Sequence, residues 1–561
     1  MRSRSDDFED DFGGTPRFQL VRELGAGGMG VVYEALDREK HVRVALKVLR
    51  SLAPEAILRF KNEFRALQQL QHENLISLGE LFEEGGRWFF TMELVEGDDF
   101  INHVRPDLAR KLLGGGDFEY QRGHANDDDT IQDVIRDRAP AIPALDEARL
   151  RAALGQLASA LCALHAAGKV HRDIKPSNIW ITAAGRLVLL DFGLVANVVG
   201  GSASIDGDVV GTTTYMAPEQ AAAMPVGPEA DWYSFGTVLY EALTGRPPFV
   251  GAPLEVLMNK QKFEPAPPRA LAPTVAPDLD LLCVALLRYD PKARPVGSEV
   301  LARLGMAGGP GAAATPAASF TQTPPFVGRA SELAVLASAF EESRRGRFVT
   351  VVVSGEAGVG KSALVQAFID RLGADASTAM VLSGRCYERE SVPYKGFDGV
   401  IDDLTRRMRG IDPVEAAFLL GPEALLLARV FPVLRRIPAL KMATFPDQEV
   451  ASPQEVRTRA FAALRSLLGR LGQRHPLVVC LDDFQWTDAD SLALLADVAH
   501  PPNAPALLLI ATVRAAGDMA PLPLPVEPRH IALSALSHDD ASALVTLLSV
   551  QLSLRCDIDV D

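Results

Sequence analysis

The sequence predicts a multidomain protein in which an α+β domain is followed by an α/β domain with a mostly parallel sheet. The chain has 561 residues, and a single core stops growing at roughly 250–300 residues, so at least two domains are expected. Residues 304–325 are rich in Gly, Ala, Pro, Ser and Thr and carry no charge, which is typical of a linker. Alternating apolar segments precede helical ones in the first part, whereas in the second an apolar strand runs into a glycine-rich loop and a helix. We expect an acidic, flexible N-terminus over residues 1–17, a first domain over 18–303 and a second over 326–561.

Composition narrows the class of protein. Hydrophobic residues make up 48% and charged residues 23% of the chain, as in ordinary globular proteins. The net charge of -15 argues against a nucleic-acid coat protein, because phosphate binding needs clustered Lys and Arg. The five cysteines show no CxxC or CxxH spacing, so neither a disulfide framework nor a zinc site is expected. With no signal peptide and no apolar run of about 18 residues, the sequence predicts a cytoplasmic protein without direct binding to nucleic acid or membrane.

The first glycine-rich segment is RELGAGGMGVVYEAL, flanked on both sides by alternating apolar residues that predict a hairpin. Its pattern GxGxxGxV is formed by Gly25, Gly27, Gly30 and Val32. Glycine allows the backbone to approach phosphate groups that a Cβ atom would repel. Taken alone, the pattern is also compatible with a glycine-rich hairpin that binds nothing.

Two charged residues follow in a predicted strand and a predicted helix. The strand VRVALKVL contains Lys47, a cation able to hold phosphate oxygens, and the helix ILRFKNEFRALQQL contains Glu63. We expect these two side chains to form an ion pair. A solvated Lys or Glu is the alternative for either residue considered in isolation.

The stretch VHRDIKPSNIW lies between two strand-like segments and carries the polar residues of a catalytic loop. Asp173 is suited to orient a hydroxyl proton and Lys175 to neutralise a transferring phosphoryl group. Asn178 and Asp191, the latter in VLLDFGL, supply the oxygen ligands that magnesium prefers. The alternative is a turn whose polar residues occur by accident, which the agreement of the preceding segments disfavours.

Five motifs occur in one order: GAGGMGVV, VALK, HRDIKPSN, DFG and YMAPE. In this respect residues 18–303 resemble the eukaryotic-type, or Hanks-type, serine/threonine protein kinases of bacteria. The resemblance implies a bilobal α+β fold, ATP and Mg²⁺ as cofactors, and transfer to Ser or Thr of protein substrates. It implies ATP binding by Gly25, Gly27, Gly30, Val32, Ala45, Lys47 and the gatekeeper Met92, catalytic roles for Asp173, Lys175, Lys47, Glu63 and Thr212, and Mg²⁺ binding by Asn178 and Asp191.

The same resemblance implies scaffold and control residues. Glu219 is expected to pair with Arg294, and Asp231 to anchor the catalytic loop. Arg172 beside the catalytic Asp implies control by a phosphorylated activation loop, because a phosphate can order that loop by pairing with an arginine. Candidate acceptors are Ser202, Ser204, Thr213 and Thr214, with Asp206 and Asp208 able to mimic part of the charge; autophosphorylation in trans is one expected route.

Residues at about 106–145 interrupt the otherwise regular pattern of the first domain. Structureless segments of this length are uncommon inside compact domains, so an insertion is expected. A surface loop and a docking element are both compatible with it.

The second domain opens with FVGR and then RFVTVVVSGEAGVGKSALVQAF, where a buried strand, a GxxxxGK[ST] loop and a helix follow one another. The amides of the loop around Gly355, Gly358 and Gly360 and the helix N-terminus would bind phosphate. Lys361 would reach the outer phosphates, and Ser362 would bind magnesium.

The strand LVVCLDD ends in two acids. Asp482 would hold magnesium through water and Asp483 would position the attacking water, unless both simply lie at the surface of a strand end. Arg514, at the end of ALLLIATVR, is a plausible phosphate sensor, and a solvated Arg is the alternative. The motifs FVGR, GEAGVGKS, LDDFQWTDADS and ATVR resemble the AAA ATPase module of the STAND class, in which nucleotide exchange switches a sensor. In this comparison the chain is expected to be truncated in the lid.

These features predict a serine/threonine protein kinase coupled to an ATP-binding and ATP-hydrolysing regulatory module in signal transduction. One alternative is a nucleotide-dependent regulatory scaffold in which the second domain binds ATP and barely hydrolyses it. A scaffold with both halves idle is disfavoured, because Lys47, Asp173 and Asp191 are all present.

Overall fold

The computed structural model describes residues 12–27, 30–68, 70–106, 144–191, 196–197, 213–306, 326–374, 379–441, 452–514 and 524–556. It contains two compact units, one formed by most of residues 1–321 and one that holds residues 322–561. Most of the expected N-terminus, insertion and linker lies outside the described residues. Among the described helices, none is long and apolar enough to cross a membrane.

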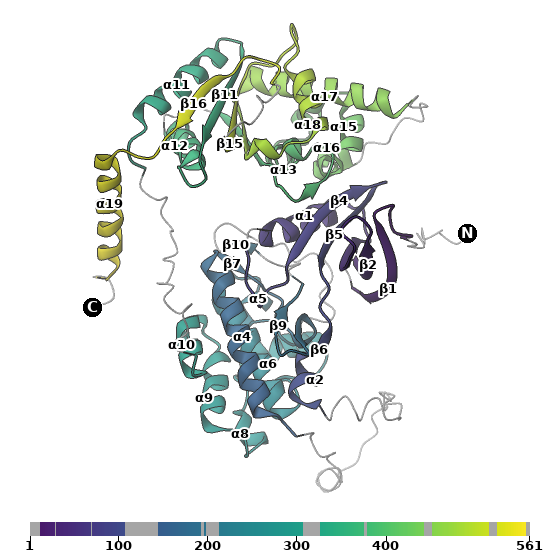
Figure 1. The fold of residues 1–561 in the computed structure, drawn as a ribbon, viewed down its shortest axis with the longest axis vertical. Coiled ribbons are helices and arrows are strands. Elements are labelled where there is room, and N and C mark those ends of the chain that lie inside the picture. The colour runs from purple at the N-terminus through teal and green to yellow at the C-terminus, as the bar shows by residue number, and fades with distance from the viewer. Residues whose placement is uncertain are drawn as a thin grey trace. The chain divides into compact units, whose positions relative to one another are not determined.

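The first unit begins with an antiparallel hairpin and a sheet that carries one helix (Figure 1). In the hairpin, Gly25 lies opposite Val32. The helix α1 (Pro54–Leu67) buries residues at helical spacing, and the rings of Phe60 and Phe64 lie 4.9 and 5.6 Å from that of Phe90. The strands lie in the order β1-β2-β3-β5-β4, with bounds β1 (Phe18–Ala26), β2 (Gly30–Asp37), β3 (Val42–Leu49), β4 (Leu78–Glu84) and β5 (Arg87–Glu93).

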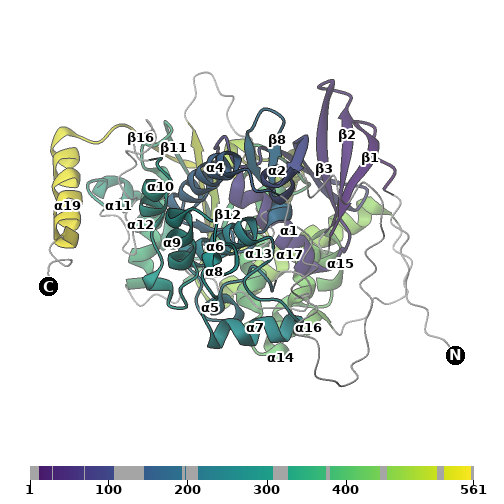
Figure 2. The same cartoon turned by 90° about the horizontal axis from the view of Figure 1, so that it is seen from below.

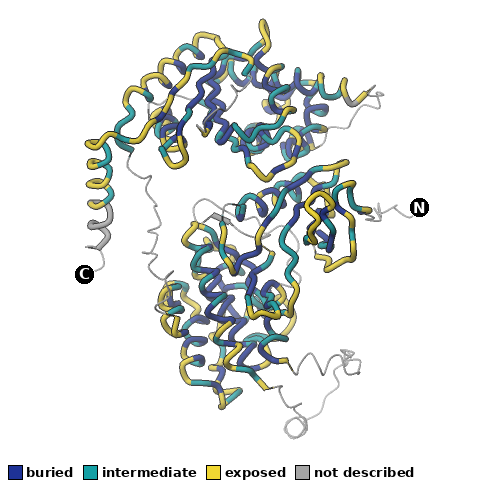
Figure 3. The backbone as a smooth tube through the Cα atoms, viewed as in Figure 1, coloured by how far each residue is buried: buried dark blue, intermediate teal, exposed yellow. Residues whose placement is uncertain are grey.

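The rest of the first unit is mainly helical. Its central helix α6 (Pro228–Thr244) begins with Pro at the first turn and ends at Gly245, whose φ of 78° suits glycine. Almost all of α6 is buried, as the dark blue interior of the tube in Figure 3 shows. The other helices are α2 (Phe100–Val104), α4 (Glu147–Ala166), α5 (Pro218–Ala221), α7 (Pro253–Lys262), α8 (Pro268–Leu271), α9 (Pro277–Leu286) and α10 (Gly297–Arg303), with the 3₁₀ turns η1 (Pro176–Asn178) and η2 (Pro291–Ala293).

Short strands frame the predicted catalytic loop. The strand-like segments expected on both sides of it are β7 (Lys169–Val170) and β8 (Ile179–Thr182). An antiparallel sheet joins β8 to β6 (Gly97–Asp99) and β9 (Leu187–Leu189), and β7 pairs with β10 (Ala196–Asn197). The loop is therefore held between two small sheets. Together with the first sheet and the helices, this arrangement is the α+β fold expected from the sequence.

The second unit contains a five-stranded sheet in the order β12-β14-β15-β11-β16. All of its pairings are parallel, which confirms the parallel α/β architecture expected from the strand-loop-helix pattern. The strands are β11 (Phe348–Gly355), β12 (Met380–Arg385), β14 (Leu477–Asp482), β15 (Leu507–Arg514) and β16 (Arg529–Leu533); β13 (Glu390–Ser391) is a further short strand.

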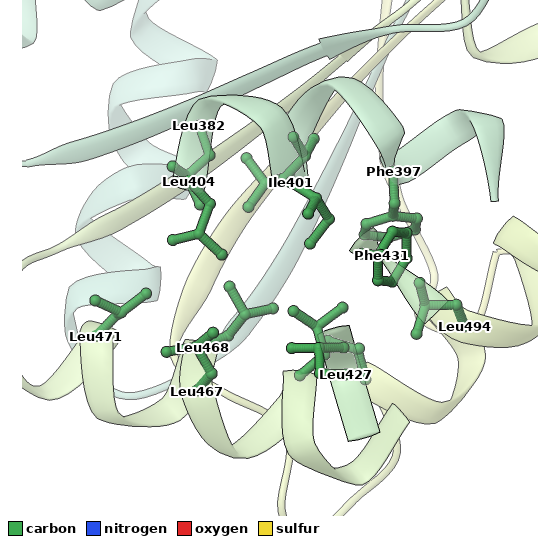
Figure 4. Packing of buried hydrophobic residues seen from close by; sticks show 14 of the residues in the cluster. Leu382, Phe397, Ile401, Leu404, Leu427, Phe431, Leu467, Leu468, Leu471 and Leu494 are labelled. Atoms are coloured by element: carbon green, nitrogen blue, oxygen red, sulfur yellow. The ribbon is translucent and has the colours of Figure 1, made fainter. Parts of the chain in front are cut away.

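Alternation along the strands divides the core of the second unit into two layers. In β15, Leu508 and Ile510 pack with α11 (Ala330–Arg344) and α12 (Lys361–Ala374), whereas Leu507 and Leu509 face the other layer. Figure 4 shows part of that other layer, where Leu382, Ile401, Leu427 and Leu467 point toward one another. Its helices are α13 (Lys395–Met408), α14 (Pro413–Leu420), α15 (Ala424–Val430), η3 (Pro432–Arg436), α16 (Pro438–Lys441), α17 (Pro453–Arg474), η4 (Phe484–Trp486) and α18 (Ala489–Val498).

The last described element is α19 (His538–Cys556). In both Figure 1 and Figure 2 this helix lies apart from the sheet of its own unit. Val545 and Leu547 on it are 62% and 45% exposed. The helix therefore contributes little to either layer of the core.

Candidate functional site

The first site is built around a buried cation on β3. Lys47 Nζ donates to Glu63 Oε1 of α1 at 2.6 Å and to Asp191 Oδ1 at 2.7 Å, and Lys47 is only 6% exposed. Burial alone would lower the pKa of Lys47, but the two carboxylates outweigh burial and raise it. The expected Lys47 and Glu63 pair is thus present, and the raised pKa keeps the Lys47 ammonium group charged beside Asp191.

The backbone of the catalytic loop is held by a buried acid on α6. The amides of His171 and Arg172 each donate to the carboxylate of Asp231 at 2.8 Å, and His165 Nε2 lies 2.8 Å from the same group. Asp231 is fully buried. Arg172 has a φ of 68°, which costs a non-glycine residue energy, so the two amide bonds hold the loop in a conformation that it would not prefer alone. This is the anchoring expected for Asp231.

The two carboxylate oxygens of Asp173 have different hydrogen-bond partners. Oδ2 accepts from Lys175 Nζ at 2.7 Å and from Asn178 Nδ2 at 3.1 Å. Asn178 Nδ2 also donates to the main-chain oxygen of Asp173 at 2.9 Å. Oδ1 is buried and has no hydrogen-bond partner within the described part of the chain. A buried acceptor without a partner is costly, so a group that donates a hydrogen bond to Oδ1 would be bound favourably.

The residues predicted to bind magnesium fit a hard cation. The side chain of Asp191 is 47% exposed, and burial, which would raise its pKa, is outweighed by Lys47, which lowers it and keeps the group anionic. Asn178 uses its amide nitrogen toward Asp173, which leaves its oxygen for a ligand. The described residues contain no cluster of three or more His, Cys, Asp or Glu side chains that could hold a metal ion. Magnesium usually binds one or two carboxylates and takes its other ligands from water and phosphate, so a carboxylate and an amide suffice.

The remaining residues expected on the nucleotide side differ in how far they are buried. A Cβ atom added at Gly25 or Gly27 would meet no atom of the described residues within 4 Å, apart from those of its chain neighbours. The glycines therefore leave room for something other than the protein's own packing. Ala45 is buried, whereas Val32 and Met92 are half-buried. Gly27 N donates to Gly30 O at 2.9 Å across the turn, whose residues 28 and 29 lie outside the described part.

The structure also bears on the expected activation segment. Thr212, Ser202, Ser204, Asp206 and Asp208 lie outside the described residues. Thr213 is only 4% exposed, so the accessible described candidate is the half-buried Thr214.

Two arginines near this segment differ in their contacts. Arg172 Nε is buried without a hydrogen-bond partner within the described part of the chain, while its Nη2 donates to Val226 O at 3.4 Å. The expected scaffold pair is present, because Arg294 donates to both oxygens of Glu219 at 2.6 and 2.9 Å.

The second site lies where β11 turns into α12. Gly358 and Gly360 have φ values of 80° and 100°, which other residues rarely adopt, so the loop depends on these glycines. Lys361 Nζ donates to the main-chain oxygens of Gly355 at 2.9 Å and Glu356 at 2.8 Å. Burial lowers the pKa of Lys361. Its side chain is thus folded back over the loop in which phosphate would lie.

The predicted magnesium pair of the second site is brought together. Ser362 Oγ lies 3.2 Å from both carboxylate oxygens of Asp482. Thr512 Oγ1 of β15 donates to Asp482 Oδ1 at 2.5 Å and accepts from the amide of Asp483 at 3.0 Å. A hydroxyl beside a carboxylate fits magnesium bound together with nucleotide. Thr512 was missed by the sequence analysis.

Both carboxylate oxygens of Asp483 lie close to arginine side chains in this structure, so neither is placed to orient a water molecule alone. Arg385 Nη2 lies 2.8 Å from its Oδ2, and Arg514 Nε lies 3.5 Å from its Oδ1. Burial, which would raise the pKa of Asp483, is outweighed by its hydrogen-bond partners Arg385 and Gln485. Arg385 was also missed, although it ends β12 and lies in register with Asp482 on the neighbouring parallel strand. The ends of adjacent parallel strands meet at one edge, which was the available signal.

Comparison with known proteins agrees with both sites. A protein kinase domain model matches residues 18–116 and 118–304, and an AAA ATPase domain model matches residues 325–510. The serine/threonine-protein kinase PknA of Mycobacterium tuberculosis is 35% identical over 286 residues, which cover 50% of this chain and 58% of PknA. The serine/threonine-protein kinase PknB of the same species is 32% identical over 291 residues, which cover 50% of this chain and 40% of PknB.

The chain therefore spans about half the length of the curated relatives it matches. The kinase match covers the first site, from the glycine-rich hairpin to Arg294, and the ATPase match covers the loop of the second site and Asp482. Domains of both kinds use ATP. This chain belongs to the protein kinase family, and it joins a kinase domain similar to those of bacterial serine/threonine kinases to an AAA ATPase domain.

Proposed function

We propose that residues 18–303 form a serine/threonine protein kinase domain that transfers the γ-phosphate of ATP to hydroxyl groups of proteins. The observation that carries this proposal is the difference between the two carboxylate oxygens of Asp173. Lys175 and Asn178 bind Oδ2, whereas Oδ1 is buried without a hydrogen-bond partner among the described residues. A substrate hydroxyl placed at Oδ1 would satisfy that oxygen and be oriented for attack. No comparable arrangement is needed in a protein that only binds nucleotide.

Each residue of the site has a place in the transfer. Lys47, held by Glu63, would bind phosphate oxygens of ATP, and the glycine-rich hairpin would cover them. Asp173 Oδ1 would accept the hydroxyl hydrogen bond and, as transfer proceeds, the proton. The hydroxyl oxygen forms a bond to the γ-phosphorus while the bond from that phosphorus to the bridging oxygen breaks, which releases ADP. Lys175 Nζ would lie beside the negative charge on the moving group.

Magnesium would be held by Asn178 and Asp191 and would supply charge neutralisation on the phosphates. The preference for Ser and Thr over Tyr rests on Lys175 and on Thr212, which would contact Asp173 and Lys175. The test is incubation of the intact chain with MgATP, labelled in the γ-phosphate, and a generic basic protein. Label on serine or threonine is expected; label on tyrosine alone would contradict the assignment.

The kinase domain is expected to phosphorylate its own activation segment. Arg172 has a buried nitrogen without a hydrogen-bond partner within the described residues, and Ser and Thr residues lie within residues 196–216. A phosphate on that segment would pair with Arg172. Phosphopeptide mapping after incubation with MgATP should find a modified residue there, and the Asp173→Ala variant should lack it. An unmodified segment in an otherwise active kinase would refute this prediction.

For the second domain, residues 326–561, we propose ATP binding that regulates the protein in signal transduction. The P-loop glycines, Lys361, Ser362 and Asp482 support it. The alternative of binding with little hydrolysis is favoured by one observation, the contacts of Asp483 with Arg385 and Arg514. A carboxylate that is held by arginines is less able to polarise water. Measuring ATP turnover and ATP affinity in the Asp173→Ala chain, in which the kinase reaction is expected to be lowered by about a hundredfold or more, separates the two possibilities.

Two nucleotides are expected to bind per chain. Each domain has its own phosphate-binding set, and the predicted linker of residues 304–325 gives no reason for one site to exclude the other. Calorimetric titration with MgATP or a non-hydrolysable analogue should give two sites per folded chain. A stoichiometry of one would show that one of the two sites is not formed.

A further inference from the structure

Lys260 on α7 is a buried lysine for which the kinase reaction described above has no use. It is 1% exposed, and its Nζ donates to three main-chain oxygens, those of Thr213 at 2.8 Å, Thr214 at 2.6 Å and Met216 at 2.8 Å. An ammonium group has three N–H donors, so all of them are used by one short segment. Within the described residues, no carboxylate forms an ion pair with Lys260.

The segment bound by Lys260 has no strand partner of its own among the described elements. The fourth main-chain oxygen of residues 213–216, that of Tyr215, accepts from Ser234 Oγ of α6 at 2.8 Å. Side chains of α6 and α7 therefore satisfy every carbonyl of this stretch. The Tyr215 hydroxyl also donates to Glu241 Oε2 of α6 at 2.6 Å. Buried carbonyls must be satisfied, so Lys260, which binds three of the four, makes the largest contribution to holding the main chain of the stretch.

The stretch lies directly before the scaffold of the catalytic loop. Gln261, the next residue on α7, donates to Pro218 O at 2.6 Å, and Gln220 donates to Arg172 O at 2.9 Å. Residues 218–220, which follow residues 213–216 in the chain, thus connect α7 to the loop that carries Asp173. Residues 213–216 also immediately follow Thr212, the residue expected to contact Asp173.

We infer that Lys260 is a positioning residue that holds residues 213–216 in the shape that receives the protein substrate beside Asp173. This inference rests on the kinase activity proposed above. Among the described residues, Lys260 forms no hydrogen bond or ion pair with an ATP-binding or catalytic side chain, so it acts through the carbonyls that it binds. Its loss should weaken use of the protein substrate and leave use of ATP unchanged.

The ionisation of Lys260 predicts a pH dependence of activity that a side chain with only a packing role would not produce. Burial lowers the pKa of Lys260 to about 7. Of the titratable groups on elements packed near α7, Glu219 is paired with Arg294, and Tyr233 presents its ring 5.6 Å from Nζ. A neutral amine has only two N–H donors for three carbonyls. The hold on residues 213–216 should therefore weaken as the pH rises through about 7.

Stability should change in the opposite direction. Because the pKa of Lys260 is lower in the folded than in the unfolded chain, the unfolded chain binds more protons between about pH 7 and the ordinary value of 10.5. Through this group, the free energy of unfolding rises with pH over that window. This change in stability follows from the lowered pKa alone, whatever the role of Lys260, so the pH dependence of activity is what reports on positioning.

The experiment compares Lys260→Met with Lys262→Met, which removes an exposed lysine from the same helix. For Lys260→Met we expect kcat/KM for a protein substrate to fall by about tenfold or more, mostly through KM, with KM for ATP unchanged. The ratio of the wild-type to the Lys260→Met value should be largest below about pH 7 and should shrink toward about pH 9. Lys262→Met should match wild type at every pH.

Amide hydrogen exchange reports on the same contact without any activity measurement. In the full wild-type chain, protection of the amides around residues 213–216, corrected for the intrinsic rate, should fall as the pH passes about 7, while that of α4 stays constant. This measurement needs no variant, so it decides the matter even if Lys260→Met does not fold. Unchanged protection, or a Lys260→Met chain with the protein KM of Lys262→Met, would overturn the inference. If the wild-type chain transfers no phosphate, the proposed function fails, and the exchange data alone support or overturn the positioning contact.

Discussion

Replacing Asp173 with alanine should lower phosphoryl transfer to protein by about a hundredfold or more, the scale of positioning and general-base contributions. The variant removes the buried oxygen that is left to accept the substrate hydroxyl. ATP affinity should stay within a few fold, because Asp173 Oδ1 is expected to face the incoming hydroxyl and not the nucleotide, and because Asn178 also donates to the main-chain oxygen of residue 173, which the substitution keeps. Label transfer to a generic basic protein and nucleotide binding, measured on the same preparation, check both parts.

Glu299→Ala is a suitable control, since it removes an exposed carboxylate of α10 in the same domain. It should behave as wild type in both measurements. Near-normal transfer by Asp173→Ala would mean that the catalytic assignment is wrong. A large loss of ATP affinity would mean that Asp173 supports the nucleotide site as well.

Replacing Lys361 with alanine should abolish phosphate binding in the second domain. A hydrogen bond to a charged group contributes about 1.5–3 kcal/mol. At about 1.4 kcal/mol per tenfold, losing two such bonds to phosphate lowers affinity by about a hundredfold or more. Phosphoryl transfer by the first domain should remain largely intact, because the residues of its site lie in a separate domain, which matches the protein kinase model, whereas Lys361 lies in the domain that matches the AAA ATPase model.

Lys441→Ala, which removes an exposed lysine of the same domain, is the matched control. Calorimetry should find two sites in this control and one in Lys361→Ala. If Lys361→Ala also silences the kinase reaction, the two domains are coupled more tightly than the predicted linker suggests. If it retains both sites, the P-loop assignment is wrong.

The kinase site was predictable to the level of individual residues because its motifs are local. Asp173, Lys175 and Asn178 lie within six residues of sequence, so one loop conformation brings them together. The pairing of Lys47 with Glu63 was also predictable, since a strand followed by a helix is a common unit. The P-loop was predictable for the same reason, because the strand, loop and helix are contiguous.

The contacts that pass between distant elements were not predictable in this way. Arg385 and Asp483 are separated by 98 residues and meet because β12 and β14 are neighbours in the sheet. In the sequence, Lys260 is one of several polar residues of a short helix, and nothing in the local sequence shows that its ammonium group is buried. Burial is decided by which helix packs over which segment.

By itself, the sequence determined the two kinds of domain, the order of their parts and the residue types that handle phosphate. Periodicity and glycine placement are properties of short segments, and short-range backbone preferences are enough to read them. Only the tertiary structure decided which oxygen of Asp173 is left without a partner, that Asp483 is held by arginines, and that Lys260 satisfies three carbonyls. These are consequences of dense packing, in which each buried polar group must find its partner among residues far away in the chain.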